Sequence, residues 1–291
     1  MIALLWPHET VLFALLGAFA LVHARNLAQR RQGIAQRPTY LQVLIGFATN
    51  FFDTLGIGNF APTTAAYRIW RVVPDALIPG TMNVGHTLPV VAMAFIFIGV
   101  IEVDATTLVT MIAAAILGSW LGAGVVTRLP QRAIQVGMGL AMLTAAALFM
   151  MAHFEAFPVG GDALALSGGE LAIACVSVAL FGALQTIGIG LYAPCMILVA
   201  LLGMNPKAAF PIMMGACAFL MPVASARFIH RDKYDHKAAL GLTFGGLPAV
   251  FLAAYVVVSL PLTSVRWLVI VVSGYAGISM LLARGGSSRT H

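Results

Sequence analysis

Residues able to bind a ligand or carry a proton lie inside an apolar segment in the first third of the chain. Thr49, Asn50, Asp53 and Thr54 form pairs at spacings of three and four positions, which places them on one face of a helix. Ionisable side chains inside apolar segments are costly and mark ligand or ion pathways. A carboxyl group there is suited to proton binding and release, so we expect Asp53 to take part in proton coupling.

A second polar face follows on the next apolar segment, where Asn83, His86 and Thr87 are spaced by three and four positions. His86 is a second candidate for proton coupling, because the imidazole ring titrates near neutral pH. The structural alternative is that Asp53 caps or pairs with Asn83 or His86, and that His86 is a hydrogen-bonded packing residue.

A glycine turn interrupts the first of these segments and occurs again later in the chain. Residues 56–62 read GIGNFAP and residues 188–194 read GIGLYAP, which is the same Gly-Ile-Gly-x-aromatic-Ala-Pro order 132 positions on. Pro74 and Pro79 recur as Pro206 and Pro211 at the same shift. We interpret this as an internal duplication.

The two turns predict an anion site. Glycine lets the backbone turn tightly and approach a ligand, and a helix that restarts after such a turn presents unpaired N–H groups and a positive dipole end. Phosphate, sulfate and carboxylate groups bind readily at such ends. The alternative is that the glycines only allow helices to cross. The expected substrate-binding residues are Gly56, Gly58, Asn59, Thr63, Asn83, His86, Gln185, Gly188, Gly190 and Tyr192.

Composition indicates the class of protein that carries this site. The 291 residues are 60% apolar and 9% charged, with a mean hydropathy of +0.96, which is typical of an all-α integral membrane protein. The net charge of +6 does not indicate nucleic-acid binding, because the basic residues gather in short loops. The three cysteines lie in apolar runs and predict neither a disulfide framework nor a metal site.

Apolar runs predict an N-terminal helix at residues 10–22, retained and not cleaved, followed by a basic loop at 23–37. Six full crossings are expected at residues 76–101, 106–126, 134–151, 207–228, 238–258 and 265–282. The two interrupted runs, 41–70 and 171–202, are too short for two crossings each, because about 30 residues of helix span about 45 Å and the hydrocarbon core is about 30 Å thick. We expect each to form a re-entrant hairpin of two partial helices.

Loop charges predict how the two halves are oriented. Residues 102–104 are acidic, whereas the equivalent residues 233–235 lie in the basic loop 230–237. Lys and Arg excess marks the cytoplasmic side, so the halves should be inverted relative to one another, as in many secondary transporters. The domains are then 1–40 (N-terminal helix and basic cytoplasmic loop), 41–153 (repeat 1), 154–169 (extracytoplasmic linker), 170–284 (repeat 2) and 285–291 (cytoplasmic tail). The N-terminus should be extracytoplasmic and the C-terminus cytoplasmic.

The duplicated Gly-Ile-Gly turn, the proline that follows each turn and the small, duplicated apolar chain resemble the TauE/SafE-type sulfite exporter family of anion permeases. The resemblance covers roughly residues 40–284. The family pattern usually continues with two further glycines, where this chain has Asn59-Phe60 and Leu191-Tyr192. The resemblance implies a secondary active transporter that exports a small sulfur-containing anion, sulfite or an organosulfonate, across the cell inner membrane. Coupling to protons is expected from Asp53 and His86 and not from the resemblance. The alternative is an anion-selective channel, or a permease for another small anion.

The sequence does not contain the residue patterns that an enzyme or a metal-binding protein would need. No nucleophile and base pair and no His-Glu-x-x-His stands in the sequence, so we expect neither an enzyme nor a catalytic residue. His86 has no companion ligands, so no metal or other cofactor is expected. The expected partners are a small inorganic or organic anion and the lipid bilayer, with no nucleic acid; the sequence also allows a homodimer.

Overall fold

The computed structural model describes residues 7–29, 37–55, 57–97, 102–156, 158–256, 270–271, 274–275, 277–278 and 281–282. This part of the chain is all-helical and contains no strand; its one isolated bridge pairs Ala163 with Met204. The helices are α1 (Pro7–Gln29), α2 (Tyr40–Thr54), α3 (Phe60–Ile69), α4 (Ile78–Phe97), α5 (Ala105–Val126), α6 (Gln131–His153), α7 (Gly168–Gln185), α8 (Tyr192–Leu201), α9 (Ala209–His230) and α10 (His236–Val256). Single 3-10 turns, η2 (Asp75–Leu77) and η3 (Pro206–Ala208), precede α4 and α9.

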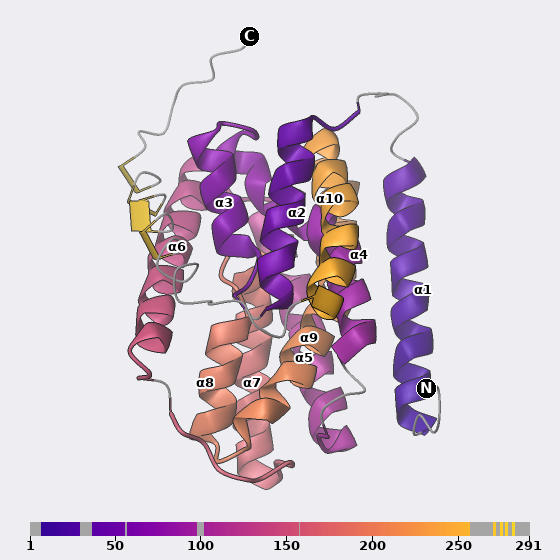
Figure 1. The fold of residues 1–291 in the computed structure, drawn as a ribbon, viewed down its shortest axis with the longest axis vertical. Coiled ribbons are helices and arrows are strands. Elements are labelled where there is room, and N and C mark those ends of the chain that lie inside the picture. The colour runs from indigo at the N-terminus through magenta and orange to yellow at the C-terminus, as the bar shows by residue number, and fades with distance from the viewer. Residues whose placement is uncertain are drawn as a thin grey trace.

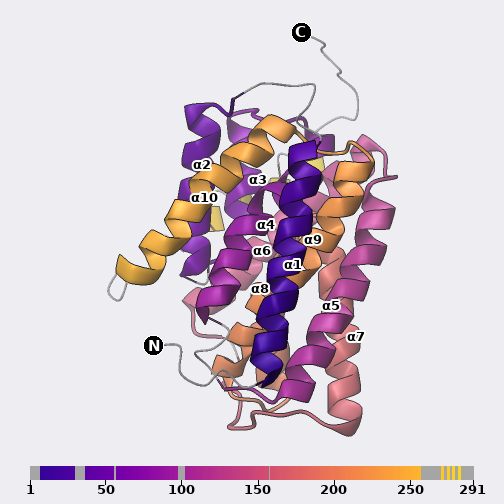
Figure 2. The same ribbon diagram turned by 90° about the vertical axis from the view of Figure 1, so that its right-hand side faces the viewer.

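Among the described residues, four helical stretches are long and apolar enough to cross a membrane: Ala105–Val126, Gly168–Gln185, Pro206–His230 and His236–Ala254. The protein is therefore suited to the membrane, as its composition predicts. The most deeply buried of the four is the stretch that contains α9, which lies at the centre of the bundle. Figure 2 shows α1 lying across the outer side of α9.

Both glycine turns break a helix, as predicted. In Figure 1, α2 and α3 lie in the upper half of the bundle and α7 and α8 in the lower half, and both breaks lie near the middle. The arms are unequal: α3 and α8 have 10 residues each, about 15 Å, whereas α7 has 18 residues, about 27 Å. One arm of the second hairpin is therefore nearly as long as the hydrocarbon core is thick.

The packing of the helices reflects the duplication. Each of α2, α3, α4 and α5 has its equivalent about 131 or 132 positions later, in α7, α8, α9 and α10. α2 packs against α10, and the equivalent contact in the other half is that of α7 with α5. In the same way, α10 contacts α4 and α5 contacts α9. The equivalent helices α4 and α9 pack against each other. Exchanging every helix for its equivalent leaves this set of contacts unchanged, so the halves interlock, each hairpin held by a helix of the other half.

Glycines allow the closest of these contacts. A Cβ added at Gly118 of α5 would lie 1.8 Å from the carbonyl oxygen of Ala179 in α7, and one at Gly245 of α10 would lie 2.0 Å from the carbonyl oxygen of Val43 in α2. Small residues let membrane helices approach until their backbones touch. Gly118 thus lets α5 pack closely against α7, as Gly245 lets α10 pack closely against α2.

Polar residues mark where helices begin. Thr39 and Gln42 form a capping box at the start of α2, with the Thr39 hydroxyl accepting from the Gln42 N–H and the Gln42 side chain accepting from the Thr39 N–H. The Asp104 carboxylate accepts from the Thr107 N–H at the start of α5.

Between α3 and α4 the Arg68 guanidinium forms an ion pair with Asp75, so Arg68 has a local structural partner.

The N-terminal helix differs from its predicted bounds. It continues beyond residue 22 to Gln29, so His23 lies inside α1, and the predicted loop at 23–37 is shorter than expected. The extension follows from packing, because His23 and Leu27 turn inward and are buried. The crossings predicted at 106–126, 134–151, 207–228 and 238–258 correspond to α5, α6, α9 and α10 within a few residues. The crossing predicted at 265–282 and the tail 285–291 lie mostly outside the described residues.

We predict that Gly118→Ala destabilises the protein, because the new methyl group must push α5 and α7 apart. The expected loss is about 1–3 kcal/mol of unfolding free energy, as for other overpacked cores. Thermal unfolding of the purified protein in detergent measures it. Gly17→Ala on α1 is the control, since nothing lies within 4 Å of a Cβ at that position. Equal stability of the two variants would contradict the close contact of α5 with α7.

Candidate functional site

The two glycine turns face one cavity of about 60 Å³. Gly58 and Asn59 of the first break and Gly190 and Leu191 of the second line it together, although they are far apart in the sequence. A single water molecule needs a cavity of about 10–15 Å³, so this cavity has room for a ligand group of a few atoms. The first turn depends on glycine, because Gly58 has a φ of 83°.

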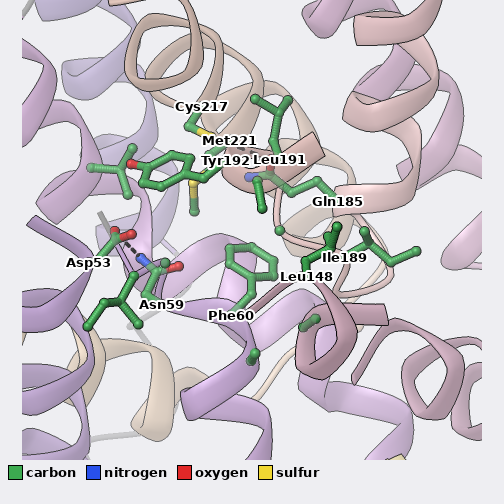
Figure 3. A pocket seen from close by; sticks show the side chains of 17 residues that line it. Asp53, Asn59, Phe60, Leu148, Gln185, Ile189, Leu191, Tyr192, Cys217 and Met221 are labelled. Atoms are coloured by element: carbon green, nitrogen blue, oxygen red, sulfur yellow. Dashed lines mark hydrogen bonds between the residues drawn. The ribbon is translucent and has the colours of Figure 1, made fainter. Parts of the chain in front are cut away.

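Five side chains give the cavity its polar character: Asp53, Asn59, Gln185, Tyr192 and Cys217. The Asn59 amide donates to the Asp53 carboxylate over 2.8 Å, as Figure 3 shows. The Cys217 thiol donates to the Gln185 side-chain oxygen over 3.4 Å. The Tyr192 hydroxyl is buried and has no hydrogen-bond partner among the described residues. A buried hydroxyl without a partner is rare in proteins, so Tyr192 is available to a ligand.

The starts of α3 and α8 also face the cavity. Neither N-cap residue, Asn59 or Leu191, makes a side-chain capping hydrogen bond. The next two residues of each helix, Phe60 and Ala61 in α3 and Tyr192 and Ala193 in α8, line the cavity. The first N–H groups of a helix lack intrahelical partners, and the helix dipole makes this end positive. Two such ends therefore offer donors to one small volume.

A hydrogen-bonded network extends from the cavity into the first half of the chain. Besides Asp53, the Asn59 amide donates to the Asn50 side-chain oxygen over 3.3 Å. Asn50 Nδ2 donates to the Gly46 carbonyl, so Asn50 Oδ1 is the atom that faces the His86 ring. His86 Nδ1 is 3.1 Å from this oxygen and must be the donor, and Nε2 lies 3.0 Å from the Thr63 hydroxyl, which can donate or accept. His86 thus joins α4 to α2 and α3 by hydrogen bonds from both ring nitrogens.

The predicted site residues divide into two groups. Gly58, Asn59, Gln185, Gly190, Tyr192 and Asp53 line the cavity. Thr63, Asn83, His86 and Gly188 do not. His86 and Thr63 are hydrogen-bonded to each other. Asn83 donates to the Pro79 carbonyl, and its side-chain oxygen has no partner in the part of the chain that the structure describes. Gly188 lies in the second turn with a φ of 120°. Gly56 lies outside the described residues.

Several lining residues were not predicted as site residues. Val90 of α4, Ala145 and Leu148 of α6, and Met221 of α9 close the cavity with apolar side chains. Nothing in the sequence distinguishes them from the many other apolar residues of these helices. Cys217 differs from these apolar residues, because its weakly polar thiol could have marked it in the sequence as a candidate site residue of the second repeat.

The charges of the cavity limit its chemistry. Among the described residues that line it, Asp53 is the only one with a carboxyl group, and none is Lys, Arg or His. Among the described residues no group of three His, Cys, Asp or Glu side chains is arranged to hold a metal ion. The cavity therefore combines N–H, O–H and amide donors with one carboxyl group that can gain or lose a proton.

Comparison with models of protein families, with curated proteins and with solved structures found no match to this chain.

Proposed function

We propose that the protein is a secondary transporter of a small anion and that the cavity between the two broken helices is its substrate site. The observation that carries the proposal is that both glycine turns, with the starts of α3 and α8, line the same cavity. In secondary transporters with inverted repeats, substrates bind where broken helices meet near the middle of the membrane.

The donors of the cavity support an anion as the substrate. The uncapped starts of α3 and α8 and the unpartnered Tyr192 hydroxyl offer hydrogen bonds without a buried Lys or Arg. Backbone N–H groups at helix starts bind phosphate, sulfate and carboxylate groups in many proteins. A ligand that accepts these hydrogen bonds would also satisfy the Tyr192 hydroxyl.

Asp53 supports coupling to protons. An ionised carboxylate in the same small cavity repels a bound anion strongly, because little water is present to screen the two charges. A protonated Asp53 removes this repulsion and offers an O–H donor. Proton and anion are therefore expected to bind in the same step, with Asn59 holding the carboxyl group in place.

Coupling of the anion to a proton determines which gradients set the direction of transport. A proton bound with a singly charged anion such as hydrogen sulfite carries no net charge, so the flux follows the anion and pH gradients and not the membrane potential. With the doubly charged sulfite ion, one negative charge moves with each transport step, and the membrane potential also acts on the flux. Export, which the resemblance to the TauE/SafE-type family implies, then requires the outward anion gradient to exceed an opposing pH gradient.

The choice of a sulfur-containing substrate rests on the resemblance to the TauE/SafE-type family. Within the class that it implies, the cavity of about 60 Å³ has room for sulfite or a small organosulfonate. Sulfite has three oxygens that can accept hydrogen bonds from the two helix starts and from Tyr192.

Inverted orientation of the repeats is part of the proposal. One observation supports it: the hairpins lie in opposite halves of the bundle. The opposite charges of the equivalent loops 102–104 and 233–235 agree with this orientation.

For the substrate site, we predict that Gly190→Leu lowers the initial rate of sulfite transport in proteoliposomes by at least about tenfold. The leucine side chain would enter the cavity, and a Cβ at Gly190 meets nothing within 4 Å, so the fold should tolerate it. Gly169→Leu, at an exposed position with equally open surroundings, is the control. Normal flux in the Gly190 variant would exclude the cavity as the substrate site.

The same assay separates a carrier from a channel. A carrier should show a rate that saturates with sulfite concentration and accelerated exchange when sulfite is present on both sides. A rate that rises linearly without exchange would support the alternative, an anion-selective channel.

For coupling, we predict that Asp53→Asn abolishes flux driven by a pH gradient while anion exchange continues. The asparagine keeps the hydrogen bond from Asn59 and cannot titrate. Flux is measured with an imposed pH gradient and, separately, with equal pH on both sides. Asp162→Asn, at an exposed loop position, is the control. An unchanged response to pH would remove Asp53 from this role.

For orientation, we predict that Glu102→Cys and Lys233→Cys react with a membrane-impermeant thiol reagent from opposite sides. Both positions are exposed and are equivalent in the two repeats. The three native cysteines are replaced first, so that labelling reports only the introduced thiol. In intact cells Glu102→Cys should be labelled, and Lys233→Cys only after permeabilisation; labelling of both from one side would refute inversion.

A further inference from the structure

A second hollow lies away from the proposed substrate site, between α1, α5 and α9. It is an open groove of about 630 Å³ near the C-terminal ends of α1 and α9. One part of its wall is apolar, with Phe19, Val22 and Val223 among its residues. The other part is basic and includes Arg227, His230 and Arg231, and none of the described residues that line the groove is Asp or Glu.

Arg227 is held at the groove by α5 and not by the end of its own helix. Its guanidinium lies 4.1 Å from the centre of the Trp120 ring, a cation–π contact. Gly124 makes room for it, because a Cβ there would lie 2.4 Å from an Arg227 nitrogen. Basic residues near a helix C-terminus often interact only with the helix dipole. That role does not explain a side chain that reaches across to a neighbouring helix.

His23 provides a second, independent observation. It lines the groove from α1 and is 2% exposed. The ring is hydrogen-bonded to the backbone of Val84 in α4, whereas its Nε2 is buried and has no partner among the described residues. The N–H of a residue in the middle of a helix is already used, so the ring must donate to the Val84 carbonyl. Nε2 is then an acceptor that lacks a donor.

We propose that this groove binds an anionic phospholipid whose headgroup carries a hydroxyl, such as phosphatidylglycerol. Arg227 and Arg231 attract the phosphate, the His23 Nε2 accepts from the headgroup hydroxyl, and an acyl chain covers the apolar wall. Basic pockets between membrane helices bind lipid headgroups of this kind. The basic residues complement the negative charge of a phosphate, and the apolar wall of the same groove complements an acyl chain. Together they favour a phospholipid over a free phosphate ion or a second copy of the chain.

The test measures lipid binding to the full chain, delipidated in a neutral detergent, by native mass spectrometry. Phosphatidylglycerol and phosphatidylcholine with the same acyl chains are compared. We expect phosphatidylglycerol to bind at least about fivefold more tightly, and Arg227→Gln to weaken it about fivefold, the effect expected for one basic residue near a lipid surface. Arg128→Gln is the matched control, because Arg128 is exposed at the end of α5 and does not line the groove.

Other outcomes overturn the proposal. These are equal affinity for the two lipids, an unchanged affinity in Arg227→Gln, or displacement of the lipid by inorganic phosphate at similar concentration, which would mean that the acyl chain is not bound. If Arg227→Gln converts a dimer to a monomer while lipid binding stays the same, the groove holds a second copy. If this variant does not fold, Arg231→Gln replaces it and must lower the affinity where Arg128→Gln does not.

A further comparison tests the role of His23. Phosphatidylmethanol keeps the phosphate charge and lacks the headgroup hydroxyl. The wild-type protein should bind phosphatidylglycerol more tightly than phosphatidylmethanol, and His23→Phe should remove this preference. Equal binding of the two lipids by the wild-type protein would show that the headgroup hydroxyl is not recognised.

Discussion

A helix that breaks inside a membrane leaves backbone N–H and C=O groups without partners, and lipid cannot supply any. Such a break is stable only where protein or a water-filled cavity surrounds it. In the described residues, α2 is separated from α3 and α7 from α8 by such a break, and residues of both breaks line a single cavity. Helices of both halves cover the breaks, because Val90 of α4, Leu148 of α6 and Met221 of α9 all line the cavity.

Glycine serves two different purposes in this structure. At Gly58 the backbone takes a positive φ, which other residues adopt only with strain. At Gly118 and Gly245 the absence of a side chain lets two helix backbones touch. The second use holds the hairpins in place, so the position of the cavity depends on glycines that lie far from it.

The polar residues of the first repeat also have separate roles. Asp53 and Asn59 reach the cavity, whereas Asn50, His86 and Thr63 connect α2, α3 and α4 behind it. The network fixes the position of Asn59 and, through it, the carboxyl group of Asp53. The hydrogen bonds of His86 give it a structural role in this network, and its predicted part in proton coupling stays a prediction.

Much of the fold was determined by the sequence itself. Apolar runs and turn residues are local properties, so the membrane class, the two breaks, the duplication and helices such as α5 and α9 could be read from periodicity and spacing. Only the tertiary structure decided which side chains meet. Val90, Leu148 and Met221 enter the cavity, while His86 and Thr63 turn away from it. Helix periodicity gives the face on which a residue lies, but the neighbour on that face depends on how distant helices cross, which is a property of the whole chain.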